Sequence, residues 1–163
     1  MKPVMLATDG SPAAEKAIST AVELAKLLGA DLVVVTVWDI PYSTLGFAAV
    51  PPSAELAQIG KEQAAKVAAE AAARAEEVGV EARTVVLRGF PVEEICLAAE
   101  KYEPRFLVIG SHGWRTVKRV LFGSVSTGVL HHAACPVLVV RGEETPQNGA
   151  KADGAREHIH AVS

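Results

Sequence analysis

The stretch GSHGWRTVKRVLFGS, residues 110–124, follows directly after four consecutive apolar residues, FLVI, residues 106–109. An apolar run of this length that ends at a glycine predicts a strand buried on both faces of a parallel sheet. In open sheets of this kind, ligand crevices form where the chain leaves the carboxyl ends of the strands. We therefore expect the functional site in this loop, ahead of a short helix predicted over residues 125–132.

The chemistry of the same region favours an anion. Gly110 and Gly113 allow backbone N–H groups to approach a ligand closely, and Gly123 and Ser124 precede the predicted helix, whose start attracts negative charge. Residues 104–142 contain no Asp or Glu, and their cationic side chains predict a local basic patch that suits phosphate. These cations are Arg105, Arg115, Lys118, Arg119 and Arg141. The alternative is that the glycines merely turn the chain and the cations form a solvated face.

Strand and helix patterns alternate on both sides of this loop. Alternation of this kind predicts an α/β fold, a single-domain open five-stranded parallel sheet flanked by helices. A loop rich in Pro, Gly and small residues, from Asp39 to Pro52, is longer than an ordinary connection between a strand and a helix. The predicted strands cover residues 4–7, 32–37, 80–87, 106–109 and 136–140, and the predicted helices cover residues 12–28, 53–78, 91–102 and 125–132.

Length and composition exclude several classes of protein. A chain of 163 residues with 50% hydrophobic residues has the size and the apolar content of one domain with a real core. The formal net charge of -3 argues against binding to nucleic acid or to a membrane surface, because those partners need a broad basic face. Cys96 and Cys135 form no CxxC pair, and no 18 apolar residues run together. We expect a soluble cytoplasmic protein.

Three segments, taken in order, resemble one known family. They are ATDGS at residues 7–11, the spacing of Gly110, Gly113, Gly123 and Ser124 with two and then nine residues between the glycines, and ACPVLVVR at residues 134–141. Together they are similar to the ATP-binding branch of the universal stress protein family. The resemblance implies a Rossmann-like fold of the adenine nucleotide alpha hydrolase type. It also implies a nucleotide-binding domain over residues 1–142. Residues 143–163 are polar, contain Gly and Pro and show no periodicity, so we expect a disordered tail there.

The resemblance also implies a set of site residues. Asp9, after the first strand, would bind ribose hydroxyls or a magnesium ion, and the backbone of Val37 would meet adenine. ATP is the expected ligand, with ADP or AMP as other possible residents, and Mg accompanies it. The expected nucleotide-binding residues are Ala7, Thr8, Asp9, Val37, Ile109, Gly110, His112, Gly113, Gly123, Ser124, Val125 and Ser126.

The function that follows is a nucleotide-dependent stress-response or signalling module with slow or no ATP hydrolysis. The family resemblance implies a homodimer formed through the last strand, and the sequence does not identify the signalling partner. One alternative is an ATP hydrolase or an adenylyl-transferring enzyme that uses His112 as a general base, although no partner carboxylate can be named. The other is a nucleotide-independent dimeric interaction protein. We assign no catalytic residue. We also assign no protein metal site, because the adjacent His131 and His132 point in different directions on a helix.

Overall fold

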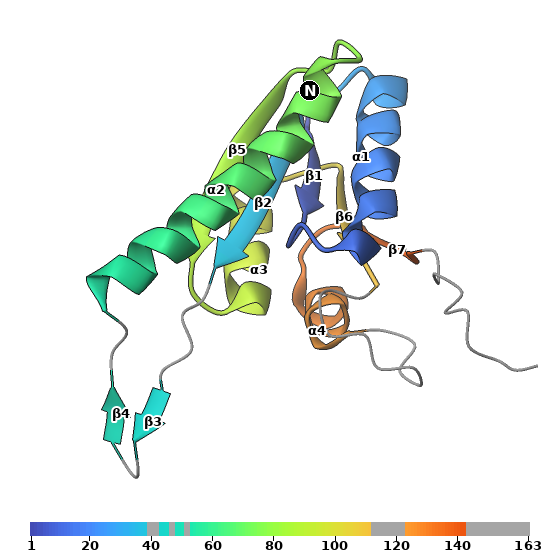
Figure 1. Cartoon of the computed structure of the whole chain (residues 1–163). Helices are drawn as coiled ribbons and strands as arrows, with labels where there is room; N and C mark the ends of the chain where they lie inside the picture. The colour runs from blue at the N-terminus through green and yellow to red at the C-terminus, as the bar shows by residue number, and fades with distance from the viewer. Residues whose placement is uncertain (39–42, 46–47, 51–52, 112–122, 143–163) are drawn as a thin grey trace, which may run out of the picture.

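A five-stranded parallel sheet forms the centre of the computed structural model, which describes residues 1–38, 43–45, 48–50, 53–111 and 123–142 (Figure 1). The strand order is β5-β2-β1-β6-β7, and every neighbouring pair runs parallel. This arrangement confirms the predicted fold class. The strands are β1 (Val4–Ala7), β2 (Leu32–Trp38), β5 (Ala82–Arg88), β6 (Phe106–Gly110) and β7 (Val137–Val140).

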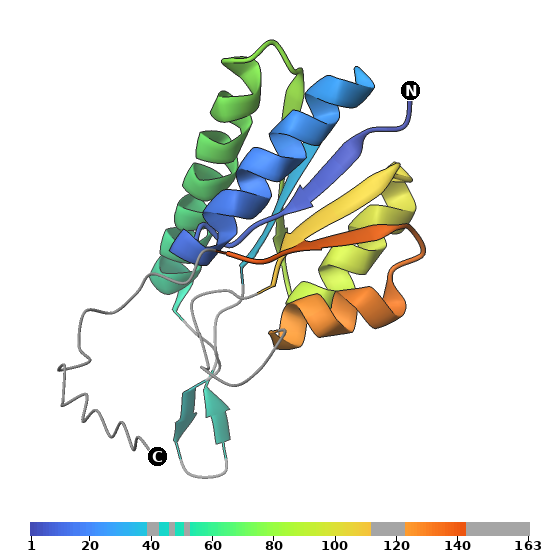
Figure 2. The ribbon, with the colours of Figure 1, turned by 90° about the vertical axis from the view of Figure 1, so that its right-hand side faces the viewer.

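Helices cover both faces of the sheet (Figure 2). The short 3-10 helix η1 (Pro12–Ala14), helix α1 (Glu15–Leu28) and helix α2 (Ala54–Glu76) lie on one face. Helices α3 (Pro91–Tyr102) and α4 (Ser124–His132) lie on the other. Of the helices in the described ranges, none is both long enough and apolar enough to cross a membrane.

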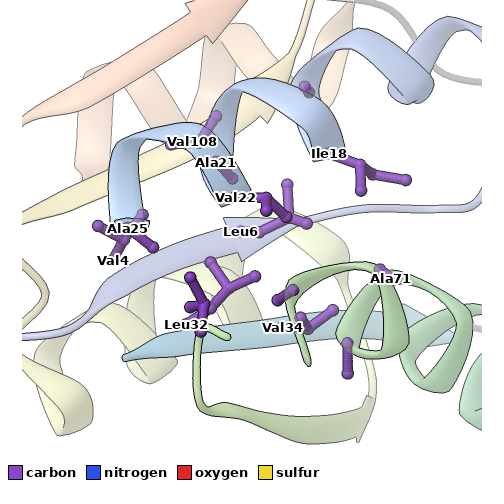
Figure 3. Close-up of a cluster of buried hydrophobic side chains, with 14 of the residues drawn as sticks. Val4, Leu6, Ile18, Ala21, Val22, Ala25, Leu32, Val34, Ala71 and Val108 are labelled. Carbon is purple, nitrogen blue, oxygen red and sulfur yellow. The ribbon is translucent and has the colours of Figure 1, made fainter. Parts of the chain in front are cut away.

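The apolar strands supply both layers of the core because successive side chains point to opposite faces. Leu6 of β1 and Val34 of β2 pack under α1 and α2, as Figure 3 shows, whereas Met5 and Val33 pack against the layer of α3 and α4. All four side chains are fully buried. Burial on both faces explains why these strands appear in the sequence as continuous apolar runs and not as alternating ones.

The ends of the two longest helices follow from local sequence. Pro12 opens η1, and Gly29 ends α1 with a left-handed φ of 61°. Ser53 caps α2 because its side-chain oxygen accepts a hydrogen bond from the backbone N–H of Leu56 at 3.3 Å. Small side chains let α2 approach the sheet, and its buried residues are all alanines: Ala64, Ala68, Ala71, Ala72 and Ala75.

The segment predicted as a long loop contains regular structure. Strands β3 (Ser43–Leu45) and β4 (Ala48–Val50) pair antiparallel and form a sheet separate from the main one. The prediction of a loop without strands was therefore wrong over these residues. Gly46 and Phe47 separate the two strands in the sequence, and a two-residue connection that begins with glycine is a common hairpin signal. The length of the segment concealed this signal.

The strand order changes direction beside β1. The chain goes from β1 to β2 and β5 on one side, then returns through α3 to β6 and β7 on the other. Strand β1 pairs with both β2 and β6, and Ala7 lies opposite Val35 and Ile109. The carboxyl ends of β1 and β6 thus flank a topological switch point, which is where open α/β sheets bind ligands.

Candidate ligand-binding site

A cavity of about 280 Å³ lies at this switch point. Residues from the carboxyl ends of β1, β2 and β6 and from the starts of α3 and α4 surround it. Segments that are far apart in the sequence thus converge on one hollow. Its lining consists of Ala7, Thr8, Asp9, Ala14, Val35, Val37, Pro91, Ile95, Ile109, Gly110, Ser111, Gly123, Ser124, Val125 and Ser126.

The turn after β1 brings Asp9 to the cavity. The N–H of Thr8 donates to the carbonyl of Val35 at 3.0 Å, which extends the pairing of β1 and β2 by one bond. The hydroxyl oxygen of Thr8 accepts from the N–H of Gly10 at 3.2 Å, and Oδ1 of Asp9 accepts from the N–H of Ser11 at 3.0 Å. Local bonds of this kind hold a turn without help from distant residues. The exposed Asp9 is therefore fixed at the edge of the sheet.

Glycine is required at position 10 for two reasons. Its φ of +70° is a left-handed conformation that other residues adopt at a cost. A Cβ atom there would also lie 2.6 Å from Cγ2 of Val67, a residue of α2. The turn that carries Asp9 thus packs directly against the helix layer.

Hydrogen bonds from backbone N–H groups and from a hydroxyl group join the two ends of the loop between β6 and α4. The N–H of Ser111 donates to the carbonyl of Val140 at 2.7 Å, which ties the end of β6 to the end of β7. The carbonyl of Ser111 accepts from the N–H of Gly123 at 2.6 Å and from the hydroxyl of Ser126 at 3.0 Å. The two ends of the loop, on either side of residues 112–122, are therefore held side by side.

The start of α4 faces the same cavity. The first hydrogen bond within the helix runs from the N–H of Thr127 to the carbonyl of Gly123 at 3.0 Å, so the N–H groups of Ser124, Val125 and Ser126 precede it. Such N–H groups, together with the helix dipole, favour an anionic ligand. Ser124, Val125 and Ser126 all line the cavity, and Ser124 is exposed.

The opposite part of the lining is apolar. Val35 and Val37 come from β2, Ile109 comes from β6, and Pro91 and Ile95 come from the first two turns of α3. An apolar wall beside a helix start suits a ligand that has a flat, weakly polar part and an anionic part. The cavity therefore has the chemical character of a site for a phosphorylated organic molecule.

Most of the predicted site residues meet at this cavity. His112 and Gly113 lie outside the described residues, as do the cations Arg115, Lys118 and Arg119. The other ten predicted residues line the cavity: Ala7, Thr8, Asp9, Val37, Ile109, Gly110, Gly123, Ser124, Val125 and Ser126.

Five further residues of the lining were not predicted from the sequence. Val35 was within reach, because it is two residues before Val37 and therefore on the same face of β2. Ser111 lies inside the loop that was singled out but was not assigned a role. Ala14, Pro91 and Ile95 could not be found from local pattern, because only the packing of η1 and α3 brings them to the carboxyl edge of the sheet.

The prediction of a basic patch was wrong for Arg105, one of the two predicted cations that the structure describes. The N–H of Arg105 donates to the carbonyl of Pro3 at 2.8 Å, and both residues precede strands at the amino edge of the sheet. Arg105 therefore lies at the edge opposite the cavity, whereas Arg141 follows β7 at the carboxyl edge. Neighbours in sequence were assumed to be neighbours in space, but the length of β6 separates residue 105 from the loop.

The cysteines and histidines do not form a metal site in the described part of the chain. Cys96 and Cys135 are half-buried, and burial raises the pKa of both thiols. Glu100 raises the pKa of Cys96 further, and Cys96 that of Cys135, so both thiols are protonated near neutral pH. Within the described ranges, no group of three or more His, Cys, Asp or Glu side chains could hold a metal ion.

A parallel sheet with helices on both faces and a strand order that reverses beside β1 defines a doubly wound α/β protein, and the cavity lies at the position where such proteins bind ligands. The model of the universal stress protein family matches residues 1–141, so the chain belongs to that family.

Individual relatives agree with this assignment. Universal stress protein YxiE of Bacillus subtilis is 35% identical over 144 residues, which cover 85% of this chain and 97% of YxiE. A universal stress protein structure from Archaeoglobus fulgidus has the same fold, with a TM-score of 0.70 at 23% identity, and the match covers 86% of this chain and 99% of that one. A universal stress protein solved in complex with cAMP is 28% identical with a TM-score of 0.62, covering 87% and 98% of the two chains.

Proposed function

We propose that this chain binds ATP in the cavity at the switch point and acts as a nucleotide-dependent stress-response or signalling module. The observation that carries the proposal is the convergence of an anion-favouring helix start, an apolar wall and the exposed Asp9 carboxylate on one cavity. The complex of a related universal stress protein with cAMP supports an adenine nucleotide as the ligand class. The proposal places the protein in the cytoplasm, as expected from the sequence.

Each part of the nucleotide has a matching part of the lining. The adenine ring would lie against the apolar wall, with the backbone of Val37 at its polar edge, and Asp9 would accept hydrogen bonds from the ribose hydroxyls. The phosphates would lie at Gly110, Gly123 and Ser124, where they meet the N–H groups of the first turn of α4. His112 and Gly113 complete the proposed set from the sequence.

Magnesium fits this lining if the nucleotide supplies most of its ligands. Mg²⁺ is commonly held by one or two carboxylates together with substrate phosphates and waters. Asp9 is the carboxylate in the lining, and its Oδ1 already accepts the N–H of Ser11. We propose that any magnesium ion enters with ATP and neutralises phosphate charge there. Phosphoryl transfer also needs a positioned nucleophile. We assign no residue to that role, and His112, the candidate base of the enzyme alternative, lies outside the described residues, so slow or absent turnover stays part of the proposal.

The dimer proposed from the family resemblance has a candidate surface. β7 is an edge strand of the main sheet, and its residue Leu138 is 39% exposed. An exposed edge strand with an apolar side chain suits pairing with the same strand of a second copy. Sedimentation of the wild type beside a Leu138→Lys variant tests this part, because the variant should be monomeric at concentrations where the wild type is dimeric.

The binding proposal is tested with two matched variants. Ser124→Asp places a carboxylate at the proposed phosphate position, whereas Thr127→Asp places one on the next exposed residue of α4, outside the lining. Both acids lie near the helix start and should not harm folding. Calorimetry with magnesium ATP should show binding to the wild type and to Thr127→Asp, and binding at least tenfold weaker to Ser124→Asp. Equal affinities of the two variants, or no binding to the wild type at millimolar ATP, would disprove the site.

A further inference from the structure

Two serines in the first turn of α4 have different surroundings. Ser124 is exposed and lines the cavity. Ser126 also lines the cavity, but 3% of it is exposed, and its hydroxyl lies 3.0 Å from the carbonyl of Ser111 and 3.0 Å from that of Gly123. A serine hydroxyl has a single hydrogen to donate. The Ser126 hydroxyl is therefore committed to backbone carbonyls, whereas Ser124 faces the space where a ligand would lie.

The two carbonyls belong to the two ends of one loop. Ser111 is the residue after β6, and Gly123 is the residue before α4. The same Ser111 carbonyl accepts the N–H of Gly123, and the N–H of Ser111 donates to Val140 at the end of β7. The Ser126 side chain thus completes a small network that joins β6, β7 and α4 at the point where α4 starts.

We infer that Ser126 is a positioning residue, whose buried hydroxyl locks the start of α4 against the end of β6 so that the N–H groups of the first turn are directed at a ligand phosphate. This inference rests on the proposed nucleotide site and adds a role that differs from direct contact. A directed group of N–H donors binds an anion better when it is already in place before the ligand arrives, because less ordering is required on binding. The gain in affinity concerns the phosphate part of the ligand, because the residues of the apolar wall lie outside α4.

The positioning role of Ser126 predicts a specific change in ligand affinity. Removing the Ser126 hydroxyl leaves one neutral hydrogen bond fewer at a buried carbonyl, and such a loss shifts the equilibrium between the ordered and the loosened start of α4 by up to about tenfold. Because affinity falls with the population of the ordered state, we expect Ser126→Ala to weaken AMP and ATP binding by up to about tenfold. Adenosine has no phosphate, so its affinity should change by less than about twofold. The ratio of the adenosine and AMP dissociation constants isolates the phosphate-dependent part.

The experiment compares the wild type, Ser126→Ala and Ser124→Ala by calorimetry with adenosine, AMP and ATP, and by hydrogen exchange of the Gly123 amide without ligand. Ser126→Ala should lower the phosphate-dependent part and speed exchange at Gly123, because that N–H donates to the same Ser111 carbonyl. Ser124→Ala should lower phosphate binding through lost contact and leave the exchange rate unchanged. Ser126→Cys, which keeps a weak donor, should behave as a milder form of Ser126→Ala and serves if the alanine variant does not fold.

The outcomes separate this inference from the proposed function. If the wild type binds AMP and Ser126→Ala keeps the full ratio, or if exchange at Gly123 does not change, the lock is refuted and the nucleotide site stands. An equal loss of adenosine and AMP affinity also refutes it, because the hydroxyl would then support the cavity in general. A wild type that binds none of the three ligands overturns the proposed function and the positioning role together.

Discussion

Replacing Gly10 with alanine should destabilise the protein by about 2 to 4 kcal/mol. The φ of +70° alone costs an alanine about 1 kcal/mol. The new Cβ would also lie 2.6 Å from Cγ2 and 2.9 Å from Cγ1 of Val67, where ordinary carbon contacts are about 3.5 to 4.0 Å. Valine has one strongly preferred rotamer in a helix, so it cannot rotate away, and overpacking of this kind costs about 1 to 3 kcal/mol.

Three further variants separate the contributions. Gly29 has a φ of +61°, and a Cβ there would meet nothing within 4 Å, so Gly29→Ala reports the backbone cost alone. Val67→Ala, made alone and together with Gly10→Ala, completes a double-mutant cycle, in which we expect a coupling energy of about 1 to 3 kcal/mol that favours the double variant. The free energies of unfolding are measured by urea titration followed by circular dichroism. If Gly10→Ala costs no more than Gly29→Ala, or if the coupling energy is zero, the packing argument is incorrect.

Three smaller predictions use the same assay. Thr36 is 3% exposed and its hydroxyl has no hydrogen-bond partner among the described residues, so Thr36→Val should raise stability by about 1 kcal/mol; a loss would show that the hydroxyl has a partner. At Gly128 of α4 a Cβ would lie 2.7 Å from Cγ2 of Val92. Gly128→Ala should therefore lower the free energy of unfolding by about 1 kcal/mol, although alanine favours helices. Adding Val92→Ala should reverse this loss. Arg74 of α2 pairs with Glu15 of α1, and this hydrogen bond raises the pKa of Arg74. Both side chains are about half exposed, so Arg74→Ala should cost less than about 1 kcal/mol, and a cost that persists in 1 M salt would contradict a screened surface pair.

Local signals in the sequence were sufficient for most elements. Ser53 and Pro91 mark helix starts through capping and a preset φ, and Gly29 marks a helix end, all of which depend on a few neighbouring residues. The hairpin of β3 and β4 was missed because a Gly-Phe connection was judged by the length of the whole segment. Arg105 was placed with the loop cations because sequence distance carries no information about which end of a strand a residue occupies.

The sequence by itself determined the fold class and helix ends such as Gly29, because apolar runs and turn conformations depend on adjacent residues. The tertiary structure alone decided the strand order β5-β2-β1-β6-β7 and therefore which strand ends meet. A strand buried on both faces has the same apolar pattern whichever strands it pairs with, so pairing is a non-local property. Pro91 and Ile95 reach the cavity, and Ser126 reaches the Ser111 carbonyl, only through that pairing and the packing of α3 and α4 upon it.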